Sequence, residues 1–202
     1  MVVSMPAIAR TDTKEAIIAC TRALMAKKGY TAVGLSEILA AVNVPKGSFY
    51  YHFASKDALG EAMLSSYFAE YLADFDEILG RGNRTAAQRI LDYFESWIES
   101  QSSFDCQGKC LAVKLGAEVA DLSESMRIAL KDGIDAIVRR VERALREGIA
   151  DESITLVGEP GRTAAALYEL WLGASVVSKL NRNADSMNNA LTLTRTFLNI
   201  AL

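Results

Sequence analysis

Long apolar segments are absent from this 202-residue chain, although 50% of its residues are hydrophobic. No run approaches the roughly 20 apolar residues that a helix needs to cross a bilayer, so no membrane association is expected. The N-terminus also lacks the basic segment followed by an apolar stretch that a secretory signal requires. The sequence therefore predicts a soluble, cytoplasmic protein.

Histidine and cysteine are scarce. The chain has one histidine, His52, and three cysteines, Cys20, Cys106 and Cys110. An odd number of thiols without an export signal favours reduced cysteines, and Cys106 with Cys110 supplies too few ligands for zinc. No glycine-rich phosphate loop or paired-carboxylate motif occurs. We expect no metal, no cofactor and no enzymatic activity.

Proline is also rare, and its positions indicate helices. Pro6, Pro45 and Pro160 each lie before a predicted helix or at its start, where proline is tolerated. Apolar residues recur at helical spacing, and no convincing strand alternation is present. The pattern predicts an all-α fold with a head, residues 1–58, and a larger body, residues 59–202. Nine helices are expected, at residues 12–28, 35–42, 45–52, 56–79, 85–101, 110–120, 124–147, 159–180 and 186–202.

The charge is unevenly distributed along the chain. The net charge is −3, yet residues 1–60 contain seven lysines and arginines against four acidic residues. A basic head on an acidic body is typical of a protein that presents one end to DNA.

Residues 35–53 have the spacing of a helix-turn-helix, with two short helices separated by a tight turn. In such a unit the N-terminal end of the second helix enters the major groove of DNA. Pro45 presets the first turn of that helix. Lys46 supplies a cation, Gly47 permits close approach of the backbone, and Ser48 brings a hydroxyl group.

Five aromatic rings follow in a row, and one helix cannot bury them all. Phe49 and Phe53 are four residues apart and share a face, so we expect them in the core of the head. Tyr50, Tyr51 and His52 then face outward, where they can contact phosphates and sugars.

The segments KKGYT at 27–31, LSEIL at 35–39 and VPKGSFYYHFASKD at 44–57 resemble the DNA-binding head of the TetR family. The resemblance covers residues 11–58. It implies a homodimeric repressor that binds palindromic double-stranded operator DNA and is released by a small-molecule inducer. By position, the family's usual DNA contacts correspond to Ser48, Tyr50, Tyr51, His52 and Lys56, with Thr31 at a backbone contact. A helical adaptor that binds protein alone is the alternative from a different class.

The segment GKCLAVKLGAEVADLSESMR at 108–127 is similar to the matching stretch of an electrophile-responsive TetR-type repressor. This resemblance implies that Cys110 senses electrophiles or oxidants, assisted by Lys179. A helix start and nearby cations, both expected at Cys110, stabilise a reactive thiolate. Cys106, one turn away, could resolve an oxidised Cys110 as a disulfide. Alternatively, Cys110 is a buried small residue and the inducer binds noncovalently.

The last two predicted helices carry the expected dimer interface, because TetR-type proteins usually pair through them. Trp171 and Ala174 in the penultimate helix and Phe197 and Leu198 in the last helix would form a bundle between subunits. A position for Trp171 in the core of one subunit is equally compatible with the pattern.

Overall fold

The computed structural model describes residues 10–101 and 110–200. These residues form nine α-helices and no strand, which confirms the all-α prediction. The helices are α1 (Arg10–Lys28), α2 (Leu35–Ala41), α3 (Lys46–His52), α4 (Lys56–Leu79), α5 (Ala86–Gln101), α6 (Leu111–Leu122), α7 (Glu124–Ala150), α8 (Pro160–Asn181) and α9 (Asp185–Phe197).

Local sequence signals account for several helix ends. The side chain of Ser55 accepts a hydrogen bond from the backbone N–H of Ala58 at 3.0 Å and caps α4. Glu159 accepts from the N–H of Arg162 at 2.9 Å, directly before Pro160 in the first turn of α8. The helix α1 stops at Gly29, whose φ of +90° is readily adopted only by glycine.

The C-terminal helix is shorter than predicted. It ends at Phe197 and does not continue to the end of the chain, so the predicted helix is wrong for residues 198–200. Asn199 adopts a left-handed conformation with φ of +49°. The N–H of Ile200 donates to the carbonyl of Arg195 at 3.0 Å, which closes the helix end.

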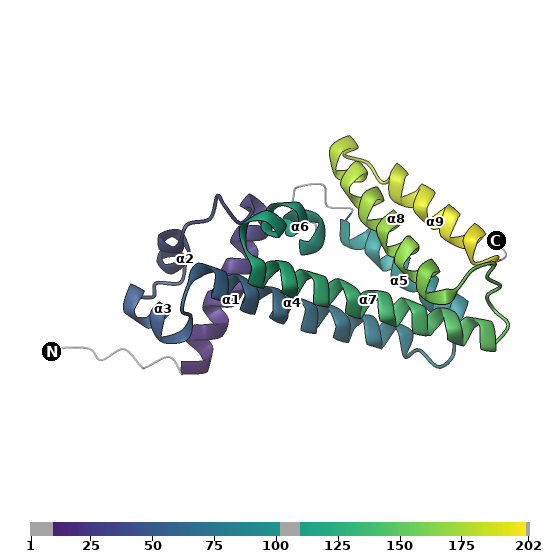
Figure 1. Ribbon diagram of the computed structural model, residues 1–202, viewed down its shortest axis with the longest axis horizontal. Coiled ribbons are helices and arrows are strands. Elements are labelled where there is room, and N and C mark those ends of the chain that lie inside the picture. The colour runs from purple at the N-terminus through teal and green to yellow at the C-terminus, as the bar shows by residue number, and fades with distance from the viewer. Residues whose placement is uncertain (1–9, 102–109, 201–202) are drawn as a thin grey trace.

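Two long helices, α4 and α7, pack along each other and form the spine of the molecule (Figure 1). Their approach is close, because a Cβ atom added to Gly133 would lie 2.3 Å from the Phe68 ring. The helices α1, α2 and α3 lie at one end of this spine, whereas α5, α8 and α9 lie at the other (Figure 1). The helix α6 packs against α1, α7 and α8 and so contacts both groups.

One buried hydrophobic cluster extends through the head and the body. It includes Ile17 and Phe49 from the head and Trp171 from the body, all fully buried. The head is therefore packed against α4 and α6 and is not joined through a linker. Among the described residues, no helix has the length and apolar character needed to span a membrane.

Candidate DNA-binding surface and sensor site

The short helix α3 is divided into a buried and an exposed face, as predicted. Phe49 is 0% exposed and Phe53, directly after the helix, is 5% exposed. Tyr50 and Tyr51 are 53% and 64% exposed. His52 is partly exposed and its ring meets that of Tyr51 edge-on at 5.0 Å. The helix thus presents polar aromatic groups while its two phenylalanines anchor it.

The N-terminal end of α3 is open to solvent. Lys46 and Gly47 are exposed and Ser48 is partly exposed. Pro45 precedes the helix in an extended conformation, so α3 begins at Lys46, one residue later than predicted. Asn43, with φ of +53°, makes the turn between α2 and α3. The predicted recognition residues are therefore brought together at one exposed helix end.

The two other predicted DNA contacts lie at the junction between head and body. Thr31 is exposed, but its backbone N–H donates to Glu118 on α6 at 2.7 Å. Lys56 is partly buried, and its Nζ donates to the carbonyl oxygen of Tyr30 at 2.7 Å and lies 4.0 Å from the centre of the Tyr30 ring. Burial lowers the pKa of Lys56 despite the nearby carboxylates. Lys56 thus binds the loop after α1 in this structure.

Cys110 lies directly before α6, which begins one residue later than predicted, and its surroundings differ from those expected. The thiol is 7% exposed. Burial raises the pKa of Cys110, and the N–H groups of Val113 and Ala112, the charge of Lys179 and a hydrogen bond with Tyr67 oppose this effect without cancelling it. The prediction of a stabilised thiolate is therefore wrong, because desolvation outweighs the helix start and the cation. Lys109 and Cys106 lie outside the described residues.

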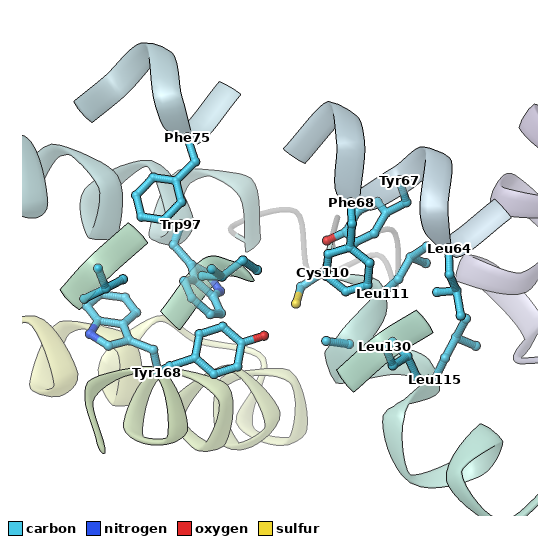
Figure 2. Close-up of a cluster of buried hydrophobic side chains, with 14 of the residues drawn as sticks. Leu64, Tyr67, Phe68, Phe75, Trp97, Cys110, Leu111, Leu115, Leu130 and Tyr168 are labelled. Carbon is cyan, nitrogen blue, oxygen red and sulfur yellow. The ribbon is translucent and has the colours of Figure 1, made fainter. Parts of the chain in front are cut away.

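Aromatic side chains from three helices surround Cys110 (Figure 2). A cavity of about 240 Å³ is lined by Cys110 together with Tyr71, Tyr93 and Trp97. The hydroxyls of Tyr71 and Tyr93 are 2.8 Å apart and hydrogen-bonded to each other. Figure 2 shows the Tyr168 hydroxyl directed toward the side of the cluster that holds Cys110. Sequence reasoning missed this group of three tyrosine hydroxyls because the tyrosines are far apart in the chain.

Two polar groups of the aromatic side chains near Cys110 have no hydrogen-bond partner among the described residues. They are the indole Nε1 of Trp97 and the hydroxyl of Tyr168, on side chains that are each 4% exposed. Burial also raises the pKa of Tyr168, so its hydroxyl stays protonated and can donate. Buried donors without acceptors are costly, and a bound acceptor would satisfy them.

The predicted dimer residues are mostly internal to one subunit. Trp171 is 0% exposed, and its Nε1 donates to Thr194 of α9 at 3.0 Å. Leu198 is also 0% exposed and Ala174 is 9% exposed. The interface position predicted for Trp171 and Leu198 is therefore wrong, and the alternative core position of Trp171 is confirmed. Phe197, at 53% exposure, is the one of the four that remains on the surface.

Both halves of the chain match models of known families. The model for bacterial regulatory proteins of the tetR family matches residues 17–63. A model for the C-terminal domain of tetracyclin repressor-like proteins matches residues 86–194.

Curated relatives and solved structures agree with these matches. The HTH-type transcriptional repressor NemR of Escherichia coli (strain K12) is 40% identical over 180 residues, which cover 89% of this chain and 90% of that protein. The HTH-type transcriptional repressor DhaR of Mycobacterium sp. (strain GP1) is 30% identical over 186 residues, 92% of each protein. The crystal structure of reduced E. coli NemR superposes with a TM-score of 0.88, covering 93% of this chain and 97% of the other. The chain belongs to the TetR family of bacterial regulatory proteins, a class of DNA-binding transcription regulators that are not enzymes.

Proposed function

We propose that this chain is a homodimeric repressor that binds a palindromic operator through α3 and leaves it when an electrophile or oxidant modifies Cys110. In this proposal residues 1–58 bind DNA, and residues 59–202 hold the sensor and the dimer interface. NemR, the 40% identical relative, is named a transcriptional repressor, which supports repression.

The exposed face of α3 is the observation that supports DNA binding most directly. Lys46 supplies a cation, while Ser48, Tyr50, Tyr51 and His52 supply polar groups on the same short helix. Such side chains can contact phosphates and base edges once the helix lies in the major groove. The family's usual contact at Lys56 would require its ammonium to leave the carbonyl of Tyr30 or to bind phosphate as well.

An apolar surface on α8 and α9 supports dimerisation. Leu180 is 77% exposed and Phe197 is 53% exposed, and three further apolar side chains on these helices are each 42% exposed: Val176, Val177 and Leu193. Large apolar side chains exposed on one pair of helices favour association with another protein. A second copy would bury them and set two α3 helices on the two half-sites of a palindrome.

The position of Cys110 supports a sensor role. Its sulfur lines the cavity and joins α6 to the aromatic cluster of α4, α5 and α8. With a maleimide, the sulfur bonds to one carbon of the C=C bond and the other carbon takes up the proton that the thiol loses. The added group then occupies the cavity and displaces the packed side chains. Burial raises the pKa of this thiol, and the charge of Lys179 opposes that rise, which would assist the reaction. With an oxidant, we propose that Cys110 loses two electrons to form a sulfenic acid, from which the thiol of Cys106 displaces water to form a disulfide.

A noncovalent inducer is the second candidate, and the unpartnered donors of Trp97 and Tyr168 favour it. An inducer with a hydrogen-bond acceptor could occupy the cavity that Trp97 lines without reacting at Cys110. The two candidates differ in reversibility. Dialysis restores operator binding after a noncovalent inducer, but not after a thioether has formed at Cys110.

Fluorescence anisotropy with a duplex from the upstream region of the chain's own gene tests the proposal. We expect saturable binding that weakens steeply with salt and competes poorly with a scrambled duplex. Treatment with N-ethylmaleimide should release the wild-type protein and Cys20→Ser, a control that removes the partly buried thiol of α1. Cys110→Ser should bind the duplex and resist release.

The outcomes separate the parts of the proposal. Release of Cys110→Ser as readily as wild type would remove the sensor but leave the repressor. Absence of sequence-specific binding to any duplex from that region would contradict the repressor itself and favour a helical adaptor.

A further inference from the structure

Glu118 on α6 binds the backbone of the head. Its Oε2 accepts a hydrogen bond from the N–H of Tyr30 at 2.9 Å, and its Oε1 accepts from the N–H of Thr31 at 2.7 Å. Tyr30 and Thr31 belong to the loop that joins α1 to α2. One carboxylate of the body therefore holds two consecutive amides of the loop that leads into the helix-turn-helix.

The chain before this loop leaves space for the carboxylate. Gly29 lies directly before Tyr30, and a Cβ atom there would lie 2.8 Å from Oε2 of Glu118. A side chain at this position would also be strained by the φ of +90°. Gly29 thus provides both the turn and the room that the interaction with Glu118 requires.

A second group holds the same loop from the start of α4. The ammonium of Lys56 donates to the carbonyl oxygen of Tyr30 at 2.7 Å, and the Tyr30 hydroxyl donates to the carboxylate of Asp57. The loop is thus fixed to α4 through the carbonyl and the hydroxyl of Tyr30, and to α6 through two adjacent amides. Because hydrogen bonds to charged groups are stronger than neutral ones, a displacement of α6 would shift or break specific contacts of the head.

Glu118 and Cys110 belong to the same short helical segment. Cys110 is the residue before α6 and Glu118 lies eight positions later, about 12 Å along a helix that rises 1.5 Å per residue. A 12-residue helix moves largely as a rigid element, so a displacement at its start reaches Glu118. The buried face of α6, which includes Leu111, Leu115 and Val119, keeps the helix packed between the two regions.

We propose that Glu118 is the positioning residue through which α6 transmits the state of Cys110 to the DNA-binding head. The proposal rests on the sensor function proposed above. In the unmodified protein, Glu118 fixes Tyr30 and Thr31 and thereby sets the position of α2 and α3. A group added to the sulfur of Cys110 displaces the start of α6, the carboxylate withdraws from the two amides, and the head loses its DNA-binding position.

The substitution Glu118→Gln tests this coupling, because it keeps the size of the side chain but replaces one acceptor oxygen by an NH₂ group. The matched control is Asp121→Asn, which removes one negative charge from the exposed face of the same helix. We expect Glu118→Gln to bind the operator about tenfold more weakly, as expected for loss of a charge-assisted hydrogen bond. Asp121→Asn should bind like wild type.

The decisive quantity is the ratio of operator affinities before and after N-ethylmaleimide modifies Cys110. We expect this ratio to fall to less than about threefold in Glu118→Gln and to stay at the wild-type value in Asp121→Asn. The rate at which Cys110 is alkylated should be the same in the wild-type protein and in both variants. A purely structural role of Glu118 would lower the affinity but leave the ratio unchanged, and that result would overturn the proposal. If alkylation changes the operator affinity of none of the proteins, the sensor function fails and the transmission proposal fails with it.

Hydrogen exchange of the unsubstituted protein gives a test that does not depend on the variant folding. We expect the amides of Tyr30 and Thr31 to exchange at least about tenfold faster after alkylation of Cys110, because each loses its acceptor. Unchanged exchange at both amides, in a protein whose operator affinity has fallen, would overturn the proposal and leave the sensor function intact.

Discussion

The reactivity of Cys110 should depend steeply on pH. Burial raises the pKa of this thiol above its ordinary value, so only a small fraction of the thiol is ionised at pH 7. The thiolate is the form that reacts with a neutral electrophile. The alkylation rate should therefore rise about tenfold for each pH unit between pH 6 and 8, since the thiolate fraction rises by that factor.

Removing the Tyr67 hydroxyl should raise the pKa of Cys110 further. This hydroxyl forms a hydrogen bond with Cys110 that lowers the thiol's pKa. A bond worth roughly 0.5–1.5 kcal/mol changes the thiolate fraction about two- to tenfold. Tyr67→Phe should therefore slow the alkylation of Cys110 by that factor at pH 7.5, while the slope with pH stays the same.

Peptide mass spectrometry after timed exposure to N-ethylmaleimide measures these rates at Cys110 separately from the other thiols. Cys20 in the same samples serves as an internal control, because Tyr67 is not among the causes of its pKa shift. A rate at Cys110 that is flat between pH 6 and 8 would show a thiolate already formed at neutral pH. That result would refute the argument that desolvation dominates this site.

Four further substitutions test the proposed DNA-binding helix, the packing of α4 on α7 and the proposed dimer surface. Tyr51→Ala should weaken operator binding by about 1–3 kcal/mol in anisotropy titrations and leave the dimer intact; unchanged affinity would remove α3 from the DNA interface. In urea denaturation, Gly133→Ala should lower the free energy of unfolding by about 1–3 kcal/mol, because the new Cβ would lie 2.3 Å from the Phe68 ring. The control Gly116→Ala, with no neighbouring atom within 4 Å, should raise the free energy of unfolding by up to about 1 kcal/mol. Equal effects of the two would contradict the tight α4–α7 packing. Leu180→Asp should shift the protein toward monomer in sedimentation velocity, since this side chain is 77% exposed on α8; an unchanged dimer would place the interface elsewhere.

Some features followed from the sequence because their causes are local. The two faces of α3 were predictable because Phe49 and Phe53 are one helical turn apart and their neighbours carry polar groups. The cap at Ser55 was predictable because its side chain binds an amide three residues later. The all-α class followed from helical periodicity, which is set by backbone geometry and not by the partner of each helix.

The C-terminal region shows where this reasoning failed. Periodicity places Trp171 on an apolar stripe but does not say whether that stripe faces another helix of the same subunit or a second subunit. In the structure Thr194 of α9 accepts the indole N–H, so Trp171 belongs to the core. Which apolar residues of α8 and α9 are exposed, such as Leu180, and which are buried depends on how the two helices pack against each other, and the sequence does not show that packing.

The sequence by itself determined the helical class, the short helix α3 with its exposed polar face, and a helix start next to Cys110, because each depends on residues within a turn or two of one another. Only the tertiary structure decided that the thiol of Cys110 is desolvated among tyrosines from α4, α5 and α8, and that Glu118 reaches the amides of Tyr30 and Thr31. The physical reason is distance along the chain: a pKa and an interhelical hydrogen bond depend on which groups the fold brings together, and residues 88 positions apart carry no local signal of their contact.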